Sequence, residues 1–168
     1  WAKGTDFLME FTSDAEYGQR ILRTDERIYH FFPDSETVFT RSQGDSIVGL
    51  ISYEDVTNEN EILDDYEAQL EGEETLGDVE TYRIRLTARR GRRVAYANQI
   101  VWIEKETYVI RKVEMYTRAM QPLKTMEIRE VDEVDGIIVP VDILITDEVR
   151  ASVTSEIFID EVEIGLSI

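Results

Sequence analysis

Alternation of apolar and polar residues over residues 96–131 most constrains what this chain can fold into. Three alternating runs follow one another there, with only short connections between them. A period of two is typical of a β-strand with one face buried and the other in water. Because short connections join antiparallel strands, this stretch predicts an antiparallel meander with strands over about 96–104, 108–117 and 123–131.

The rest of the chain is also largely β-patterned. Gly18 and Pro33 mark turns between strands, Asp135-Gly136 is a hairpin signal, and Pro140 indicates an edge or a bulge. The further strands are expected over 6–13, 19–24, 27–32, 36–42, about 66–70, 79–88, 137–146 and 152–162. A sheet of so many strands curls, splits or closes, so we predict a mainly β fold with a strongly curved antiparallel sheet, in one domain over residues 1–168.

The pattern breaks over residues 43–60. Ile47, Leu50 and Ile51 stand at positions i, i+3 and i+4, which is the spacing of a helical stripe. We therefore expect one or two short helices in this segment. They would form a lid over the apolar face of the sheet.

Composition excludes several classes of function. The chain has 36 acidic and 18 basic residues and a net charge of −18, so it repels nucleic acid and anionic membrane surfaces. It has no cysteine, which excludes disulfides and cysteine-based metal or redox chemistry. No run approaches the roughly 20 apolar residues of a membrane span.

Catalytic and metal motifs do not stand out. His30 is the one histidine and lies within an expected strand, and the chain carries neither a nucleophile elbow nor a glycine-rich phosphate loop. The acidic clusters lack the spacing of a metal-binding loop. We expect no enzyme activity, no cofactor and no metal site, although a hydrolase using a pair of carboxylates stays open as an alternative.

Charge is segregated along the chain. Residues 43–81 contain no lysine or arginine, whereas residues 83–93 contain six arginines. The first interpretation is that the two segments lie close together and partly neutralise each other. The alternative is an exposed loop that docks an anionic group or an acidic partner through Arg89, Arg90, Arg92 and Arg93.

Inward-facing positions of the expected strands are the candidates for a binding surface. An ordinary core would explain each of them singly, but the large sheet, its short cover and the frequency of methionine and phenylalanine favour an apolar cavity. The candidates are Phe7, Met9, Phe11, Ile21, Phe31, Tyr82, Ile84, Leu86, Val113, Met115, Met126 and Ile128.

An ordered set of sequence segments runs through nearly the whole chain. They read DFLMEFTS, GQRILRTDERIYHFFPDSETVFTRS, SYEDV, DYEAQLEGEE, YRIRLTA, IVWIEKETYVIRKVEMY, LKTMEIREV and DGIIVPVDILITD. Each piece alone is weakly specific, but their combination resembles the LolA-like family of outer-membrane lipoprotein-sorting proteins.

The resemblance implies an incomplete β-barrel with lid helices over residues 42–60. It further implies a non-enzymatic periplasmic carrier of lipoprotein acyl chains or another lipid, with membrane-bound donor and acceptor proteins as partners. Trp102 and Tyr29 match aromatic positions of the family, and Arg23 and Arg41 would lie near the mouth. The family also has a helix and a strand upstream of Trp1, and a lipid anchor there stays open. The alternative is an envelope interaction or stress-sensing module with the same fold.

Overall fold

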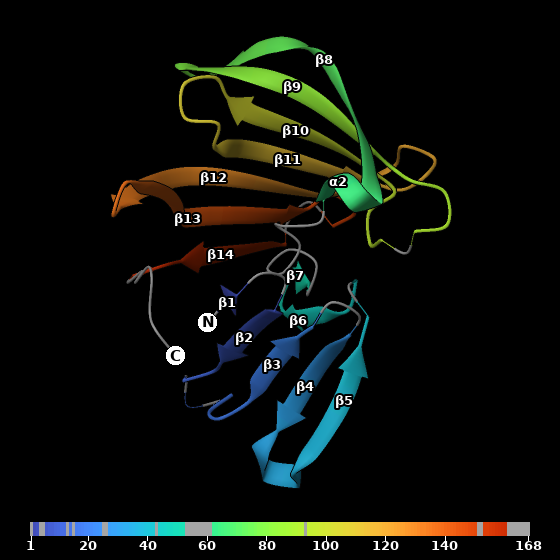
Figure 1. Cartoon of the computed structure of the whole chain (residues 1–168), viewed down its shortest axis with the longest axis vertical. Coiled ribbons are helices and arrows are strands. Elements are labelled where there is room, and N and C mark those ends of the chain that lie inside the picture. The colour runs from blue at the N-terminus through green and yellow to red at the C-terminus, as the bar shows by residue number, and fades with distance from the viewer. Residues whose placement is uncertain are drawn as a thin grey trace. The chain divides into compact units, whose positions relative to one another are not determined.

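The computed structural model describes residues 2–3, 6–12, 14, 16–24, 27–42, 44–52, 62–92, 94–150 and 153–160. The chain forms two compact units, one of Trp1–Asp65 with Arg93–Ala95 and one of Tyr66–Arg92 with Tyr96–Ile168. We call them the five-stranded unit and the seven-stranded unit after their main sheets (Figure 1). Both sheets are antiparallel, so the predicted mainly β fold is confirmed, whereas one domain over 1–168 stays a prediction.

The five-stranded unit contains an antiparallel meander in which each strand pairs with the next along the chain. Its strands are β1 (Ala2–Lys3), β2 (Asp6–Glu10), β3 (Arg20–Arg23), β4 (Ile28–Phe32) and β5 (Thr37–Arg41). Ile21 and Ile28 form its buried centre, against which Met9, Phe11 and Ile47 pack.

Two turns at one end of this sheet meet. Gly18 adopts a φ of +76° in the β2–β3 connection, and a Cβ placed on it would lie 3.4 Å from Cγ of Pro33. Pro33 opens a short 3-10 helix, Pro33–Ser35, between β4 and β5. The turn at Gly18 and the strand end at Pro33 are therefore confirmed.

The segment expected to form lid helices is a β-hairpin where it is described. Strands β6 (Ser46–Val48) and β7 (Ile51–Ser52) pair antiparallel, and the Ser46 hydroxyl donates a 2.9 Å hydrogen bond to the Gly49 carbonyl. The helix predicted through Ile47, Leu50 and Ile51 is thus wrong, because Gly49 adopts a φ of +56° and three apolar residues cannot sustain a helix alone. Residues 53–60 lie outside the described part, and the lid role of the segment stays a prediction.

The only α-helix in the described part of the chain is the single turn α2 (Ile62–Asp65). No helix among the described residues is long and apolar enough to cross a membrane.

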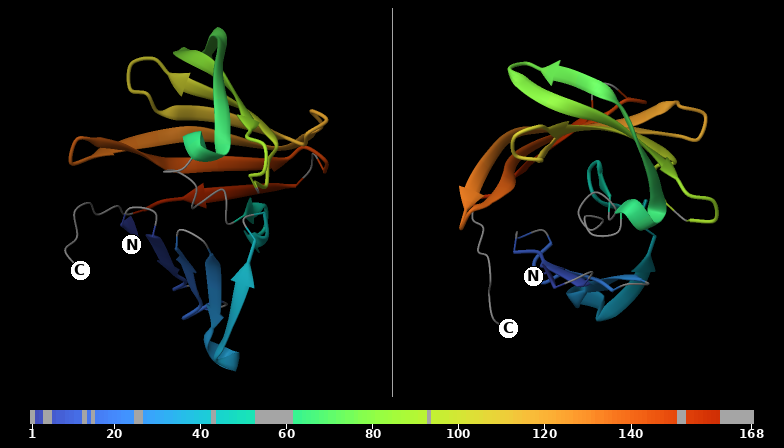
Figure 2. Two further views of the ribbon diagram at one scale, coloured as in Figure 1. Left: turned by 45° about the vertical axis from the view of Figure 1, so that its right-hand side comes forward. Right: turned by 45° about the horizontal axis from the view of Figure 1, so that its top comes forward.

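The seven-stranded unit is a longer meander with every strand paired to its chain neighbour. Its strands are β8 (Tyr66–Leu76), β9 (Val79–Ala88), β10 (Asn98–Glu104), β11 (Ile110–Tyr116), β12 (Pro122–Val134), β13 (Ile137–Asp147) and β14 (Thr154–Phe158). The sheet is strongly curved and does not close on itself, as Figure 2 shows. This confirms the expected incomplete barrel and the meander of β10, β11 and β12.

Irregularities in the ladder explain part of this curvature. The register shifts between Leu70 and Gly72 on β8, between Trp102 and Ile103 on β10, and on either side of Glu130 on β12. Such bulges bend a strand and increase its twist. The shift beside Glu130 lies next to Pro140, as the sequence predicts.

Asp135 and Gly136 adopt φ angles of 51° and 80° in the turn between β12 and β13. Two successive positive φ values suit the right-handed twist of the flanking strands. The predicted hairpin is therefore confirmed.

Candidate functional site

One face of the seven-stranded sheet carries a row of apolar residues, which we call the apolar row. Residues directly opposite each other on neighbouring strands point to the same face. The pairings Leu70–Ile84, Ile84–Val101, Val101–Val113, Val113–Met126 and Met126–Ile145 follow one another across the sheet. The row thus runs over the six strands from β8 to β13, and five inter-strand spacings give it a length of about 24 Å.

The predicted binding residues of this unit all share the face of the apolar row. Ile84, Val113 and Met126 lie in the row, while Tyr82 and Leu86 flank it on β9 two residues from Ile84. Met115 and Ile128 also stand two residues from a row position, on β11 and β12. The alternation of apolar and polar residues in the sequence therefore identified residues that the structure places on one face.

Sequence reasoning missed three members of the row. Leu70, Val101 and Ile145 alternate correctly within their strands, but only the register shows that they continue the row. Val101 and Ile145 are 3% and 0% exposed, whereas Leu70 is 61% exposed at the free edge of the sheet. The row is therefore open at its β8 end and buried at Val101 and at its β13 end.

The other predicted binding residues belong to the separate five-stranded unit. Their strands pair in a different sheet from those of the apolar row, and one continuous inner surface for all twelve candidates stays a prediction. Met9 and Ile21 are direct partners on one face, and Phe11 packs with them. Phe31 pairs instead with Arg20 and Val38 on the opposite face, which corrects its assignment to the same surface. Phe7 lies on β2, and its side chain is outside the described part.

Tyr29, which matches an aromatic position of the family, and the two arginines expected near the mouth occupy ordinary strand positions of the five-stranded unit. Arg23 is 4% exposed on β3, and Tyr29 is half-buried on β4. The Arg41 guanidinium lies 5.8 Å from the ring centroid of Phe32 and 5.3 Å from that of Phe39. Arg41 therefore packs on aromatic rings by cation–π contact.

His30 lies within the aromatic cluster of this unit. Its ring stacks against Phe32 with centroids 4.1 Å apart, and Phe11 is 6.2 Å away on centroids. His30 Nε2 and Gln19 Oε1 are 2.9 Å apart in a hydrogen bond. Burial, together with the nearby Arg41 charge, lowers the pKa of His30, so burial favours its neutral form.

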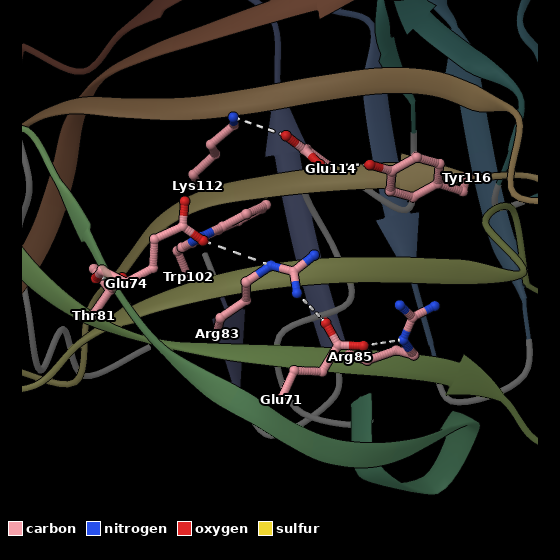
Figure 3. Close-up of polar contacts among 9 residues, drawn as sticks. All are labelled: Glu71, Glu74, Thr81, Arg83, Arg85, Trp102, Lys112, Glu114 and Tyr116. Carbon is pink, nitrogen blue, oxygen red and sulfur yellow. Dashed lines mark hydrogen bonds and ion pairs between the residues drawn. The ribbon is translucent and has the colours of Figure 1, made fainter.

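The opposite face of the seven-stranded sheet is polar and centred on Trp102 (Figure 3). Trp102 is 4% exposed, and its indole Nε1 donates a 3.0 Å hydrogen bond to Glu74. The cations of Arg83 and Lys112 lie 5.5 and 5.0 Å from the indole ring. This face therefore covers a large aromatic side chain with paired charges rather than offering it to a ligand.

Ion pairs join the acidic and the basic segments of the chain. Glu71 on β8 pairs with both Arg83 and Arg85 on β9, and Glu74 lies 3.7 Å from Arg83 (Figure 3). The interpretation that these segments neutralise each other is thus confirmed for these residues.

The predicted docking loop is a turn with exposed side chains. Arg89, Arg90 and Arg92 are exposed, with a 3.2 Å hydrogen bond from the Arg92 amide to the Arg89 carbonyl. Arg93 lies outside the described residues. Docking of an anionic group or an acidic partner by this loop stays a prediction.

Glu114 and Tyr116 extend the polar face along β11. The Tyr116 hydroxyl donates to Glu114, and burial together with this hydrogen bond raises the pKa of Tyr116 to about 12. Burial alone would raise the pKa of Glu114, but hydrogen bonds from Lys112 and Tyr116 lower it below its ordinary value. These shifts belong to a structural ion-pair network on the sheet surface.

Metal chemistry finds no support in the part of the chain that is described. No group of three or more histidine, aspartate or glutamate residues there could hold an ion.

The apolar row, in contrast, could lie along a hydrocarbon chain. An acyl chain in one leaflet of a bilayer spans about 15 Å, which is shorter than the row.

Comparison with known proteins supports the fold. A family model described as an uncharacterized protein matches residues 3–168. A search of curated protein sequences found no match.

Several solved structures have the same fold. A DUF1329 family protein from Desulfovibrio piger superposes with a TM-score of 0.81 at 21% identity, over 95% of this chain and 72% of its own. A LolA superfamily protein from Nitrosomonas europaea gives 0.77 at 24% identity, over 91% and 69%. A domain from Vibrio parahaemolyticus, provisionally named an outer membrane lipoprotein-sorting protein, gives 0.77 at 17% identity, over 95% and 73%.

Proposed function

We propose that this chain, which belongs to the family described as an uncharacterized protein whose model matches residues 3–168, is a non-enzymatic lipid carrier. It binds an acyl chain of a lipoprotein or of another lipid against the apolar row of the seven-stranded sheet. The fold that it shares with a LolA superfamily protein and with a lipoprotein-sorting domain supports this class of function.

The apolar row is the single observation that carries the proposal. It gathers aliphatic and methionine side chains on one face of six consecutive strands, from Leu70 to Ile145, and is exposed at Leu70. Each methylene that leaves water against such a surface contributes about 0.8 kcal/mol. Met126 in the row and Met115 beside it have flexible side chains that adapt to apolar ligands of different shape.

The place of action belongs to the same proposal. The carrier works in the periplasm, where a lipid must cross water between two membranes. It receives its cargo from one membrane-bound protein and passes it to another. The acidic exterior, with a net charge of −18, keeps a protein with an apolar binding surface in solution.

Binding of a fluorescent fatty-acid analogue tests the proposal. Ile84→Asp places a charge in the apolar row and should weaken binding by at least about tenfold, since an unpaired charge against hydrocarbon costs several kcal/mol. Thr87→Asp adds the same charge to an exposed position on the opposite face of β9 and should leave binding unchanged.

Circular dichroism and thermal melting establish that both variants remain folded. If Ile84→Asp destabilises the sheet, Ile84→Trp fills the row without a charge and serves as the second variant. Equal binding by the folded row variant and wild type would show that the acyl chain lies elsewhere. No binding of the analogue by the wild-type protein would favour the alternative of an envelope interaction module.

A further inference from the structure

A hollow of about 380 Å³ lies at one end of the five-stranded unit. It forms where the β2–β3 connection meets the β4–β5 turn, at the contact between Gly18 and Pro33. Its volume is at the lower end of the range of about 300–1,000 Å³ for small-ligand sites, which suits a single side chain. The lining residues central to its chemistry are Asp14, Glu16, Asp34, Tyr17, Phe32 and Phe39.

The lining combines carboxylates with aromatic rings and contains no lysine or arginine. Tyr17 and Phe39 are 72% and 47% exposed, so their rings are open to a partner. Carboxylates around a concave surface attract cations, and aromatic faces stabilise them further by cation–π contact. An anion would be repelled here, and an apolar group would desolvate the carboxylates without compensation.

Two of the carboxylates are not neutralised by any cation that the structure describes. Asp14 and Asp34 are exposed and form no ion pair among the residues that the structure describes. The rings of Phe32 and Phe39 already accept the guanidinium of Arg41, which does not line the hollow. The same rings are therefore compatible with a guanidinium group.

We propose that this hollow binds an arginine side chain presented by a partner protein. The guanidinium lies between the carboxylates of Asp14 and Asp34 and contacts the rings of Tyr17 and Phe39. This inference concerns the five-stranded unit alone and does not depend on lipid binding by the seven-stranded sheet.

Titration with Nα-acetyl-arginine amide, followed by the amide chemical shifts of the labelled full chain, tests the proposal. The amides of residues 14, 16–19 and 34–39 should shift in a saturable manner. Nα-acetyl-citrulline amide has nearly the same shape without the charge and should produce no saturable shift. Nα-acetyl-lysine amide should bind more weakly, because an ammonium group lacks the planar fork of arginine.

Substitutions in the hollow measure the contributions of its carboxylates and of its aromatic rings to arginine binding separately. Asp14→Asn with Asp34→Asn should weaken arginine binding about tenfold, and Tyr17→Leu about threefold. Asp78→Asn with Glu106→Gln removes the same charge from exposed turns of the seven-stranded unit and should leave binding unchanged. Equal shifts with citrulline, no shift with arginine up to its solubility, or unchanged binding by the Asp14/Asp34 double variant would each overturn the proposal.

Discussion

The indole Nε1 of Trp102 donates a 3.0 Å hydrogen bond to the carboxylate of Glu74. Trp102 lies on β10 and Glu74 on β8, so this bond crosses the intervening strand β9. It ties the free edge of the seven-stranded sheet to the centre of its polar face.

Loss of this bond should loosen the edge strand. Trp102→Phe keeps an aromatic ring for Arg83 and Lys112 but removes the donor, and we expect a loss of about 1–3 kcal/mol in the free energy of unfolding. Glu74→Gln keeps an acceptor and should cost less. Urea denaturation measures both values, and an equal loss in the two variants would contradict the assigned hydrogen bond.

Glu71 should be the most sensitive carboxylate on β8. Its side chain is 18% exposed and pairs with Arg83 and Arg85, which would lose their shared partner in Glu71→Gln. We expect a loss of about 1–3 kcal/mol in the free energy of unfolding. Glu106→Gln, at an exposed position of the β10–β11 turn, is the matched control and should change it by less than about 0.5 kcal/mol. Similar losses in both variants would mean that the Glu71 pairs add no stability.

Tyr116 should titrate at unusually high pH. Its folded pKa of about 12 lies above the ordinary value of 10.0, because burial and the bond to Glu114 disfavour the phenolate. The resulting stabilisation is complete below pH 10 and is lost as pH rises through 12. Difference absorbance of wild type and Tyr116→Phe isolates this one tyrosine. A difference titration centred near 10 would contradict the burial and the hydrogen bond.

Most strands and turns could be predicted because their signals are local. Alternation fixes a strand and its two faces, and the turns at Gly18 and Asp135-Gly136 depend on backbone conformations that few residues adopt. The apolar row was predictable in part for the same reason. Its continuation through Leu70, Val101 and Ile145 depends on register and bulges, which sequence alternation does not encode.

Two predictions were wrong for the same physical reason: a local sequence pattern is compatible with more than one structure. The run containing Phe31 is apolar at nearly every position, so alternation could not show that Ile28 and His30 occupy the buried face. Ile47, Leu50 and Ile51 fit a helical stripe, but Gly49 turns the chain into a hairpin. Alternation also says nothing of which strands share a sheet, so the division into two sheets was not predictable.

His30 should make the five-stranded unit sensitive to mild acid. Burial and the neighbouring Arg41 lower its folded pKa below 6.5, so the unfolded chain takes up a proton more readily than the folded one. Stability from neutral His30 is therefore complete above pH 6.5 and declines as pH falls from there toward the lowered folded pKa. The slope cannot exceed about 1.4 kcal/mol per pH unit for one proton.

His30→Gln removes this titration and keeps a polar side chain beside Gln19. The free energy of unfolding of wild type minus that of the variant should fall between about pH 7 and about pH 5. Taking the difference cancels the carboxylates that begin to titrate at the lower end of this range, because both proteins share them. Thermal melts across the range provide the measurement. The burial of His30 between Phe11 and Phe32 is the reason to expect a pH-dependent difference. A difference that does not change with pH would mean that His30 binds protons equally in the folded and the unfolded chain, and would contradict the prediction.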